Sequence, residues 1–176
     1  MGTAYLPTSP SKNLLRFADE ISLGKGPVLD APSGSGRNAF ALAARGCTVL
    51  AVDNDRNRLI EIEQIKASCP AGQIFTVCAD LKPELWPFMS ASFSAIVCIH
   101  FPVTNLVPCF ISSLQRNGYI YIETFGGHGE NFQQLPKAGQ LKELLSTHVQ
   151  FKYYKERKVG PMAFDAVSVI LFAQKQ

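Results

Sequence analysis

The sequence lacks the features that mark a secreted, zinc-binding or membrane-spanning protein. Its five cysteines are an odd number, and none forms the Cys-x-x-Cys pair typical of zinc sites. No apolar run approaches the roughly 20 residues that a membrane-spanning helix needs, and residues 1–12 have no charged and apolar regions of a secretory signal. We therefore expect one domain over residues 1–176, cytoplasmic, with reduced cysteines, no metal ion and no contact with a membrane.

The net charge of the chain is also small, which bears on the kind of partner that the protein can have. The 17 Lys and Arg residues exceed the 14 Asp and Glu residues by three, and they are scattered except between Lys152 and Lys158. Proteins dedicated to nucleic acid usually carry a larger and clustered basic excess, whereas a row of lysines is typical of an edge strand. The composition therefore disfavours a nucleic-acid partner. It predicts no particular oligomeric state.

Patterns of helix and strand alternate along the whole chain. Apolar residues recur at helical spacing from the Ser9-Pro10 pair to Gly24, and short apolar runs then alternate with helical segments. The last two strands are joined through Val159-Gly160-Pro161, too short a connection for a parallel crossover. We predict a doubly wound α/β fold whose seven-stranded, mostly parallel sheet ends in an antiparallel hairpin. The predicted strands are residues 27–31, 48–52, 73–79, 93–100, 119–124, 150–156 and 164–173, and the later helices are residues 36–44, 56–68, 105–115 and 140–146.

The most informative segment is VLDAPSGSGRNA, residues 28–39. A strand enters the Gly34-Ser35-Gly36 turn, and a helix begins directly after it. Glycines let the backbone turn sharply and come close to a ligand, and the amides at the start of the helix carry partial positive charge. Asp53 ends the second strand, 53 − 36 = 17 residues after Gly36, where an acidic residue accepts both ribose hydroxyls of an adenosine. The segment therefore predicts a binding site for adenosine.

Asp30 separates two classes of adenosine-containing cofactor. A Gly-x-Gly-x-x-Ala loop also occurs in nicotinamide enzymes, whose strand leads straight into the first glycine so that the pyrophosphate rests on helix amides. Here a carboxylate ends the strand four residues before Gly34, where it repels a pyrophosphate and attracts the α-amino group of a methionine. S-adenosylmethionine is the predicted cofactor, and a nicotinamide-dependent oxidoreductase is the alternative.

These motifs resemble those of the class I S-adenosylmethionine-dependent methyltransferases. Residues 28–55 are similar to that family's first two strand motifs, and Ala79-Asp80-Leu81 resembles its adenine-binding position. GSGRNAFALA and NFQQLPKAGQLKELL resemble the small tellurite-resistance and thiopurine type of methyltransferase. The resemblance implies one Rossmann-like methyltransferase domain, in which residues 1–26 form an N-terminal helix and lid-like segment and residues 27–176 form the core. It implies cofactor contacts at Asp30, Gly34, Gly36, Asp53, Asn54, Asp80 and Leu81, and the neighbouring Pro32, Ser35, Arg37 and Ile99 complete the predicted set.

His100 is the candidate catalytic residue, because it ends the fourth strand where substrates enter such a sheet. Glu123 and His128, at the end of the fifth strand and in the loop after it, are further candidates. Residues 99–102 read Ile-His-Phe-Pro rather than the Asn-Pro-Pro-Tyr-like tetrapeptide of enzymes that methylate amino groups of nucleic acids and proteins. This favours a small acceptor, such as a thiol or a chalcogen anion. A non-catalytic relative that binds the cofactor or a partner protein is a third hypothesis.

Overall fold

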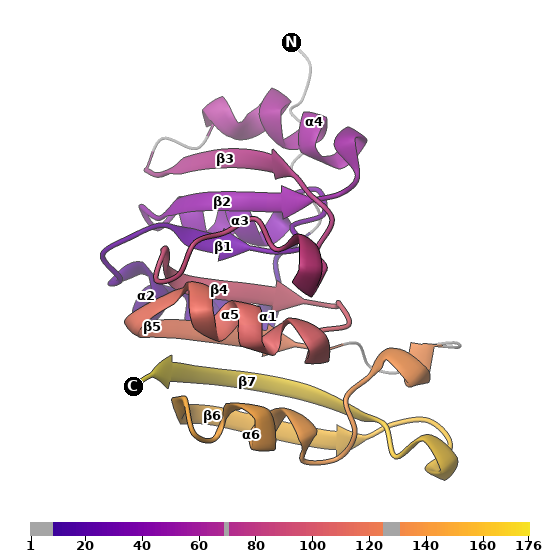
Figure 1. Ribbon diagram of the computed structural model, residues 1–176. Helices are drawn as coiled ribbons and strands as arrows, with labels where there is room; N and C mark the ends of the chain where they lie inside the picture. Colours follow the sequence, from indigo (N-terminus) through magenta and orange to yellow (C-terminus); the bar gives the residue numbers. More distant parts are fainter. Residues whose placement is uncertain (1–8, 69–70, 125–130) are drawn as a thin grey trace.

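The computed structural model describes residues 9–68, 71–124 and 131–176 (Figure 1). Within these ranges, seven strands form one sheet in the order β3-β2-β1-β4-β5-β7-β6. Strands β1 to β5 pair in parallel, whereas β7 runs antiparallel to both β5 and β6, and its arrow points against theirs in Figure 1. This arrangement confirms the predicted fold class. The strands are β1 (Val28–Asp30), β2 (Thr48–Asp53), β3 (Gln73–Cys78), β4 (Phe93–Ile99), β5 (Leu114–Glu123), β6 (Val149–Lys158) and β7 (Val167–Lys175).

Helices cover both faces of the sheet and bury two apolar cores (Figure 1). On one face lie α1 (Lys12–Leu15), α2 (Ala18–Ser22), α3 (Arg37–Ala43) and α4 (Arg56–Ile65). On the other lie α5 (Val107–Ser113) and α6 (Gln140–Leu145). All seven residues of β4 are buried, as expected for a parallel strand covered on both sides. No helix in the described ranges is long and apolar enough to cross a membrane. Shorter 3₁₀ segments are Lys66–Ser68, Pro83–Leu85, Thr104–Leu106, Asn131–Gln134 and Met162–Phe164.

The prediction of one helix from Ser9 to Gly24 is wrong. Ser11, rather than Ser9, caps the first helix, since its Oγ accepts the N–H groups of Asn13 and Leu14 at 3.2 and 3.3 Å. The helix is interrupted at Phe17, whose ring stacks on Phe172 of β7 with the centroids 4.6 Å apart. Packing of this ring against the sheet accounts for the division into α1 and α2, because the apolar spacing alone would allow one continuous helix.

Two other predicted boundaries also differ from the structure. The strand predicted from Phe164 begins at Val167, because residues 162–164 form a 3₁₀ turn before it. Strand β5 begins at Leu114, ahead of the predicted turn at Asn117-Gly118, so the preceding helix ends at Ser113 rather than near residue 115. The ammonium group of Lys175 donates to the carbonyls of Ile111 and Leu114 at 2.6 and 2.7 Å, which satisfies acceptors exposed at that helix end.

The basic run between Lys152 and Lys158 lies on β6, which forms one edge of the sheet. This position confirms the prediction of an edge strand. Lys152 forms an ion pair with Glu20 of α2 and Lys158 one with Asp165, at 2.5 and 3.7 Å. Part of the basic excess is therefore neutralised within the protein itself, which agrees with the reading of this run as a solvated strand face.

Candidate cofactor-binding and active site

Four polar side chains lie at the carboxyl ends of the central strands. Asp30 ends β1, Asp53 ends β2, His100 directly follows β4 and Glu123 ends β5. Parallel pairing of β1 with both β2 and β4 places these ends side by side, at the point where the strand order reverses. In doubly wound sheets this is where ligands bind.

Asp53 holds the glycine loop in place. Its Oδ2 accepts the N–H of Gly34 at 2.8 Å, and its Oδ1 accepts the N–H of Asp55 at 3.0 Å. The N–H of Ser33 donates to the carbonyl of Val52 at 2.8 Å, so the loop is fixed to β2 at a second point. A carboxylate has about four lone-pair positions, and each oxygen of Asp53 keeps capacity for a ribose hydroxyl. Asp55 caps α4 by accepting the N–H of Asn57 at 2.9 Å.

Asp30 is fully buried, and neither of its carboxyl oxygens has a hydrogen-bond partner in the described structure. Burial raises the pKa of this carboxyl to about 7, although the polarity of the Ala39 amide and the charge of Arg37 both lower it and Asp53 raises it further. A buried and unpaired carboxyl group is costly. Such a carboxyl at the end of β1, just before the glycine loop, fits a site that receives a cationic ligand group.

A cavity of about 400 Å³ opens in front of the glycine loop. Six residues of the predicted set line it, and three further residues that the sequence did not indicate complete the lining. The predicted residues are Pro32, Gly34, Ser35, Arg37, Ile99 and His100, and the additional ones are Ser33, Asn38 and Arg58. Arg58 extends from α4 toward the loop, with its Nη1 3.5 Å from the position that a Cβ at Gly34 would occupy. It thus places a second guanidinium beside Arg37.

The two glycines of the loop differ in what surrounds them. Both have positive φ, +55° at Gly34 and +80° at Gly36. A Cβ at Gly36 would lie 2.8 Å from Cγ1 of Ile62 in the buried core, whereas a Cβ at Gly34 would meet only the end of the flexible Arg58 side chain. Gly36 is thus required first by the packing of α3 against α4, and its contact with the cofactor stays a prediction.

We expect Gly36→Ala to destabilise the fold by about 1–3 kcal/mol, because the added methyl group overpacks the core at Ile62. Gly34→Ala, the matched variant, carries a similar φ penalty but meets only the end of the flexible Arg58 side chain, so it should lose more cofactor affinity than thermal stability. Thermal unfolding and equilibrium binding of S-adenosylhomocysteine, measured on both variants, check this contrast. Equal melting temperatures for the two variants would contradict it.

The predicted adenine-side residues lie outside the cavity lining. Asp80 forms an ion pair with Lys82 at 2.6 Å, and the side chain of Leu81 is buried in the core beneath the sheet end. Asn54 is exposed directly after β2. These positions are compatible with the rim of an adenine site, and their contacts with the cofactor stay predictions.

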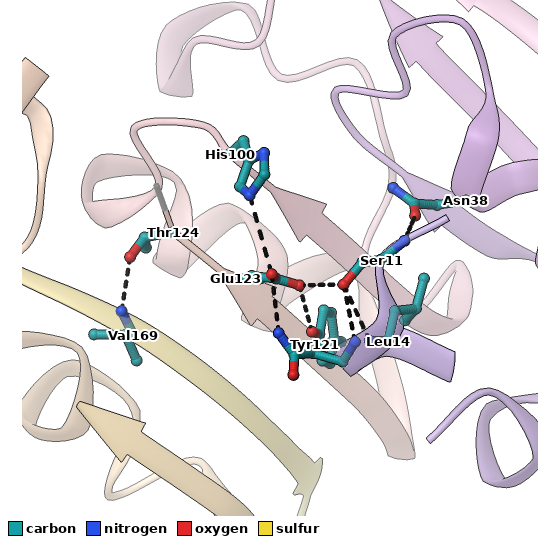
Figure 2. Close-up of polar contacts among 9 residues, drawn as sticks. Ser11, Leu14, Asn38, His100, Tyr121, Glu123, Thr124 and Val169 are labelled. Carbon is teal, nitrogen blue, oxygen red and sulfur yellow. Dashed lines mark hydrogen bonds and ion pairs between the residues drawn. The ribbon is translucent and has the colours of Figure 1, made fainter. Parts of the chain in front are cut away.

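His100 and Glu123 belong to a polar cluster that reaches the N-terminal segment (Figure 2). His100 has a φ of +58°, in the left-handed region that residues other than glycine seldom adopt, and its N–H donates to the Glu123 carbonyl at 2.7 Å. Burial and the charge of Arg37 lower the pKa of His100, and the Glu123 carboxylate raises it, with a net lowering. His100 is therefore a neutral imidazole at neutral pH. His128 lies outside the described residues.

The sequence did not indicate Ser11 as a member of this cluster. Ser11 donates its Oγ–H to the Glu123 carboxylate, and its main-chain N–H donates to Oδ1 of Asn38 at 3.0 Å (Figure 2). Asn38 belongs to α3 and lines the cavity. Ser11 thus ties the start of α1 to both the glycine-loop helix and the end of β5. Spacing in the sequence carries no signal for a contact between residues 112 positions apart.

These residues fit S-adenosylmethionine. The unpaired Asp30 carboxyl matches an ammonium group, Asp53 matches a ribose, and Arg37 in the cavity wall matches a carboxylate. A pyrophosphate would instead bring its negative charge toward Asp30. Together, the doubly wound sheet and a crevice of this chemistry at its switch point define a Rossmann-like protein that binds an adenosine-containing, amino-acid-bearing cofactor.

Comparison with known protein families gives the same class. The profile described as a methyltransferase domain matches residues 28–117, just over half of the chain. The chain therefore belongs to the methyltransferase domain family, and its fold is shared by solved S-adenosylmethionine-dependent methyltransferases. No curated protein matches the chain by sequence.

Solved structures with the same fold include methyltransferases of several kinds. TehB from Haemophilus influenzae superposes with a TM-score of 0.75 at 19% identity, over 98% of this chain and 64% of TehB, so the chain spans about two thirds of its length. A SAM-dependent methyltransferase from Methanosarcina mazei has a TM-score of 0.64 at 16% identity, over 96% and 99% of the two chains. The tRNA (m1A58) methyltransferase TrmI from Aquifex aeolicus has a TM-score of 0.64 at 11% identity, over 97% and 71%. Such low identities establish the fold alone.

Proposed function

We propose that this protein transfers the methyl group of S-adenosylmethionine to a small-molecule acceptor that is a soft nucleophile, a thiol or a chalcogen anion. The observation that carries the cofactor part is the buried Asp30 carboxyl, which ends β1 just before the glycine loop and has no hydrogen-bond partner in the described structure. The small acceptor is supported by the modest basic excess and by the Ile-His-Phe-Pro sequence after β4.

The bound cofactor supplies an electrophilic methyl group on a sulfonium, and the protein supplies alignment. Asp53 and the glycine loop fix the adenosine end, Asp30 receives the amino group, and His100 and Asn38 border the space beside the reacting centre. Holding two reactants in line contributes roughly 7–11 kcal/mol to catalysis. A soft nucleophile then needs no strong base, which matches a site whose nearest imidazole has a lowered pKa.

Two measurements separate this function from its alternatives. Calorimetric titration with S-adenosylmethionine and with NAD distinguishes a methyltransferase from a nicotinamide-dependent oxidoreductase, and we expect binding of the first only. Incubation with labelled cofactor and a panel of thiol, selenite, tellurite, phenol and amine acceptors then distinguishes an enzyme from a non-catalytic relative. We expect S-adenosylhomocysteine to accumulate with at least one thiol or chalcogen acceptor. Cofactor binding without turnover of any acceptor would favour the non-catalytic relative.

We expect His100→Ala to lower the single-turnover rate less than tenfold at about pH 8, with little change in cofactor affinity, because alignment rather than proton removal dominates with a soft acceptor. The exposed His148, near the end of α6, provides the matched control as His148→Ala. A hundredfold loss with intact cofactor binding would contradict this prediction. It would make His100 a general base and move the acceptor toward oxygen or nitrogen.

A further inference from the structure

Glu123 places a largely buried carboxylate at the end of β5, beside His100 of the cavity wall. Its side chain is only 13% exposed. Three donors hold the carboxylate in position: the hydroxyl of Ser11, the hydroxyl of Tyr121 at 2.7 Å and the Nδ2 of Asn13 at 3.2 Å. Because these donors come from α1, its cap and the interior of β5, the carboxylate is fixed before any ligand arrives (Figure 2).

The bonds of this carboxylate leave one of its acceptor positions unused. A carboxylate has about four lone-pair positions. Ser11 and Tyr121 both donate to Oε2, and Asn13 donates to Oε1. The Nε2 of His100 is 4.0 Å from Oε1, which is longer than a hydrogen bond. Among the described residues, Oε1 therefore keeps an acceptor position on the side of His100, which lines the cavity.

Among the described residues, no Lys or Arg forms an ion pair with Glu123. His100 is the only residue in the described part of the chain that forms an ion pair with it, and burial keeps that imidazole neutral near pH 7. Arg37 and Arg58 line the cavity beside the glycine loop, where Arg37 acts on Asp30. Arg37 also acts on His100, and Arg16 acts on Tyr121, but neither forms an ion pair with Glu123 in the described part of the chain, so no guanidinium neutralises this carboxylate directly. A charge held at this depth attracts a cationic ligand and repels an anionic one by the same Coulomb interaction.

We propose that Glu123 selects the acceptor: a small thiol that carries an ammonium group, which binds Oε1 of Glu123 and directs the sulfur toward the cofactor. This selection rests on the proposed function and narrows its class of acceptor, since the Glu123 carboxylate repels an oxyanion. In the transfer, the acceptor sulfur bonds to the methyl carbon as the bond from that carbon to the sulfonium breaks. The electron pair of the broken bond stays on the cofactor sulfur, and the thiol proton leaves to solvent.

A charge-matched series of thiols tests the proposal. Cysteamine is cationic, 2-mercaptoethanol is neutral and 3-mercaptopropionate is anionic, so they differ mainly in the group beside the sulfur. Dissociation constants are measured by calorimetry with the protein saturated with S-adenosylhomocysteine, and methylation rates are measured with S-adenosylmethionine. We expect wild-type protein to bind cysteamine at least tenfold more tightly than 3-mercaptopropionate, with 2-mercaptoethanol between them.

Variants of Glu123 assign that preference to its charge. Glu123→Gln keeps the size of the side chain, and the preference should fall below threefold. Glu123→Asp keeps the charge but moves it away from the ligand, so a smaller preference for cysteamine should remain. Glu143→Gln removes an exposed carboxylate of α6 and should leave the wild-type preference intact. Because thiols differ in intrinsic acidity, the ratio between wild type and variant is the quantity compared.

The outcomes separate this inference from the proposed function. If S-adenosylhomocysteine does not bind, the proposed function fails and the acceptor selection fails with it. If it binds and the three thiols bind equally, or Glu123→Gln keeps the tenfold preference, only the selection by Glu123 is overturned. Faster methylation of selenite than of cysteamine would also overturn it. Should Glu123→Gln not fold, Glu123→Asp still decides, because an unchanged preference in that variant contradicts a contact at Oε1.

Discussion

Asp30→Asn is expected to stabilise the ligand-free protein at high pH while weakening cofactor binding. Burial raises the pKa of Asp30 in the folded state from its ordinary value of 3.8 to about 7, so the folded state favours the protonated form. The carboxyl group therefore destabilises the fold increasingly as pH rises from about 4 to about 7, by about 4 kcal/mol in full. An amide removes that penalty. We expect the stability advantage of the variant over wild type to grow by about 3 kcal/mol between pH 5 and pH 8.

The cofactor should respond in the opposite direction. An ammonium group bound to Asp30 favours the ionised carboxylate, so wild-type protein should bind S-adenosylhomocysteine about tenfold more tightly at pH 8 than at pH 6. Asp30→Asn should bind at least tenfold more weakly at pH 8 and lose most of this pH dependence. Denaturant unfolding and calorimetry across the pH range measure both effects, with Asp19→Asn, at an exposed aspartate, as the control. A pH-independent stability difference would contradict the burial argument.

Asp53→Ala is expected to weaken cofactor binding by about 2–3 kcal/mol, or about 30- to 150-fold, while the fold survives. Two ribose hydrogen bonds are lost, and the glycine loop also loses the acceptor for the Gly34 N–H. Asp53→Asn keeps one side-chain oxygen, so its affinity for the cofactor should lie between those of Asp53→Ala and wild type. Calorimetry with S-adenosylhomocysteine provides the affinities, and the melting temperature shows that the protein is folded. Binding unchanged within error would remove Asp53 from the ribose site.

The sequence was sufficient for the part of the site that depends on strand order. Parallel strands end at a common edge, so a strand ending in Asp30 and a second ending in Asp53 predict neighbouring carboxylates. The glycine loop between them predicts a close approach of the backbone to a ligand. These are local patterns on neighbouring elements, and the structure places them as the patterns require.

Contacts that depend on tertiary packing could not be predicted in this way. The contact of Ser11 with Glu123 depends on where α1 lies on the sheet, and the packing of Phe17 on Phe172 helps to hold that position. Arg58 approaches Gly34 from α4, although its surroundings in the sequence are those of any solvated helix residue. Likewise the spacing of Gly36 suggests a ligand, yet its nearest atoms belong to Ile62. Each of these depends on how a helix lies on the sheet, which periodicity does not specify.

The central claim is that the crevice between Asp30 and Asp53 binds S-adenosylmethionine in preference to a dinucleotide. A calorimetric titration of the wild-type protein with S-adenosylmethionine, repeated in the presence of excess NAD, tests it most directly. The account predicts one cofactor bound per chain, with an affinity that NAD does not change. No binding of S-adenosylmethionine, or its displacement by NAD, would contradict the account.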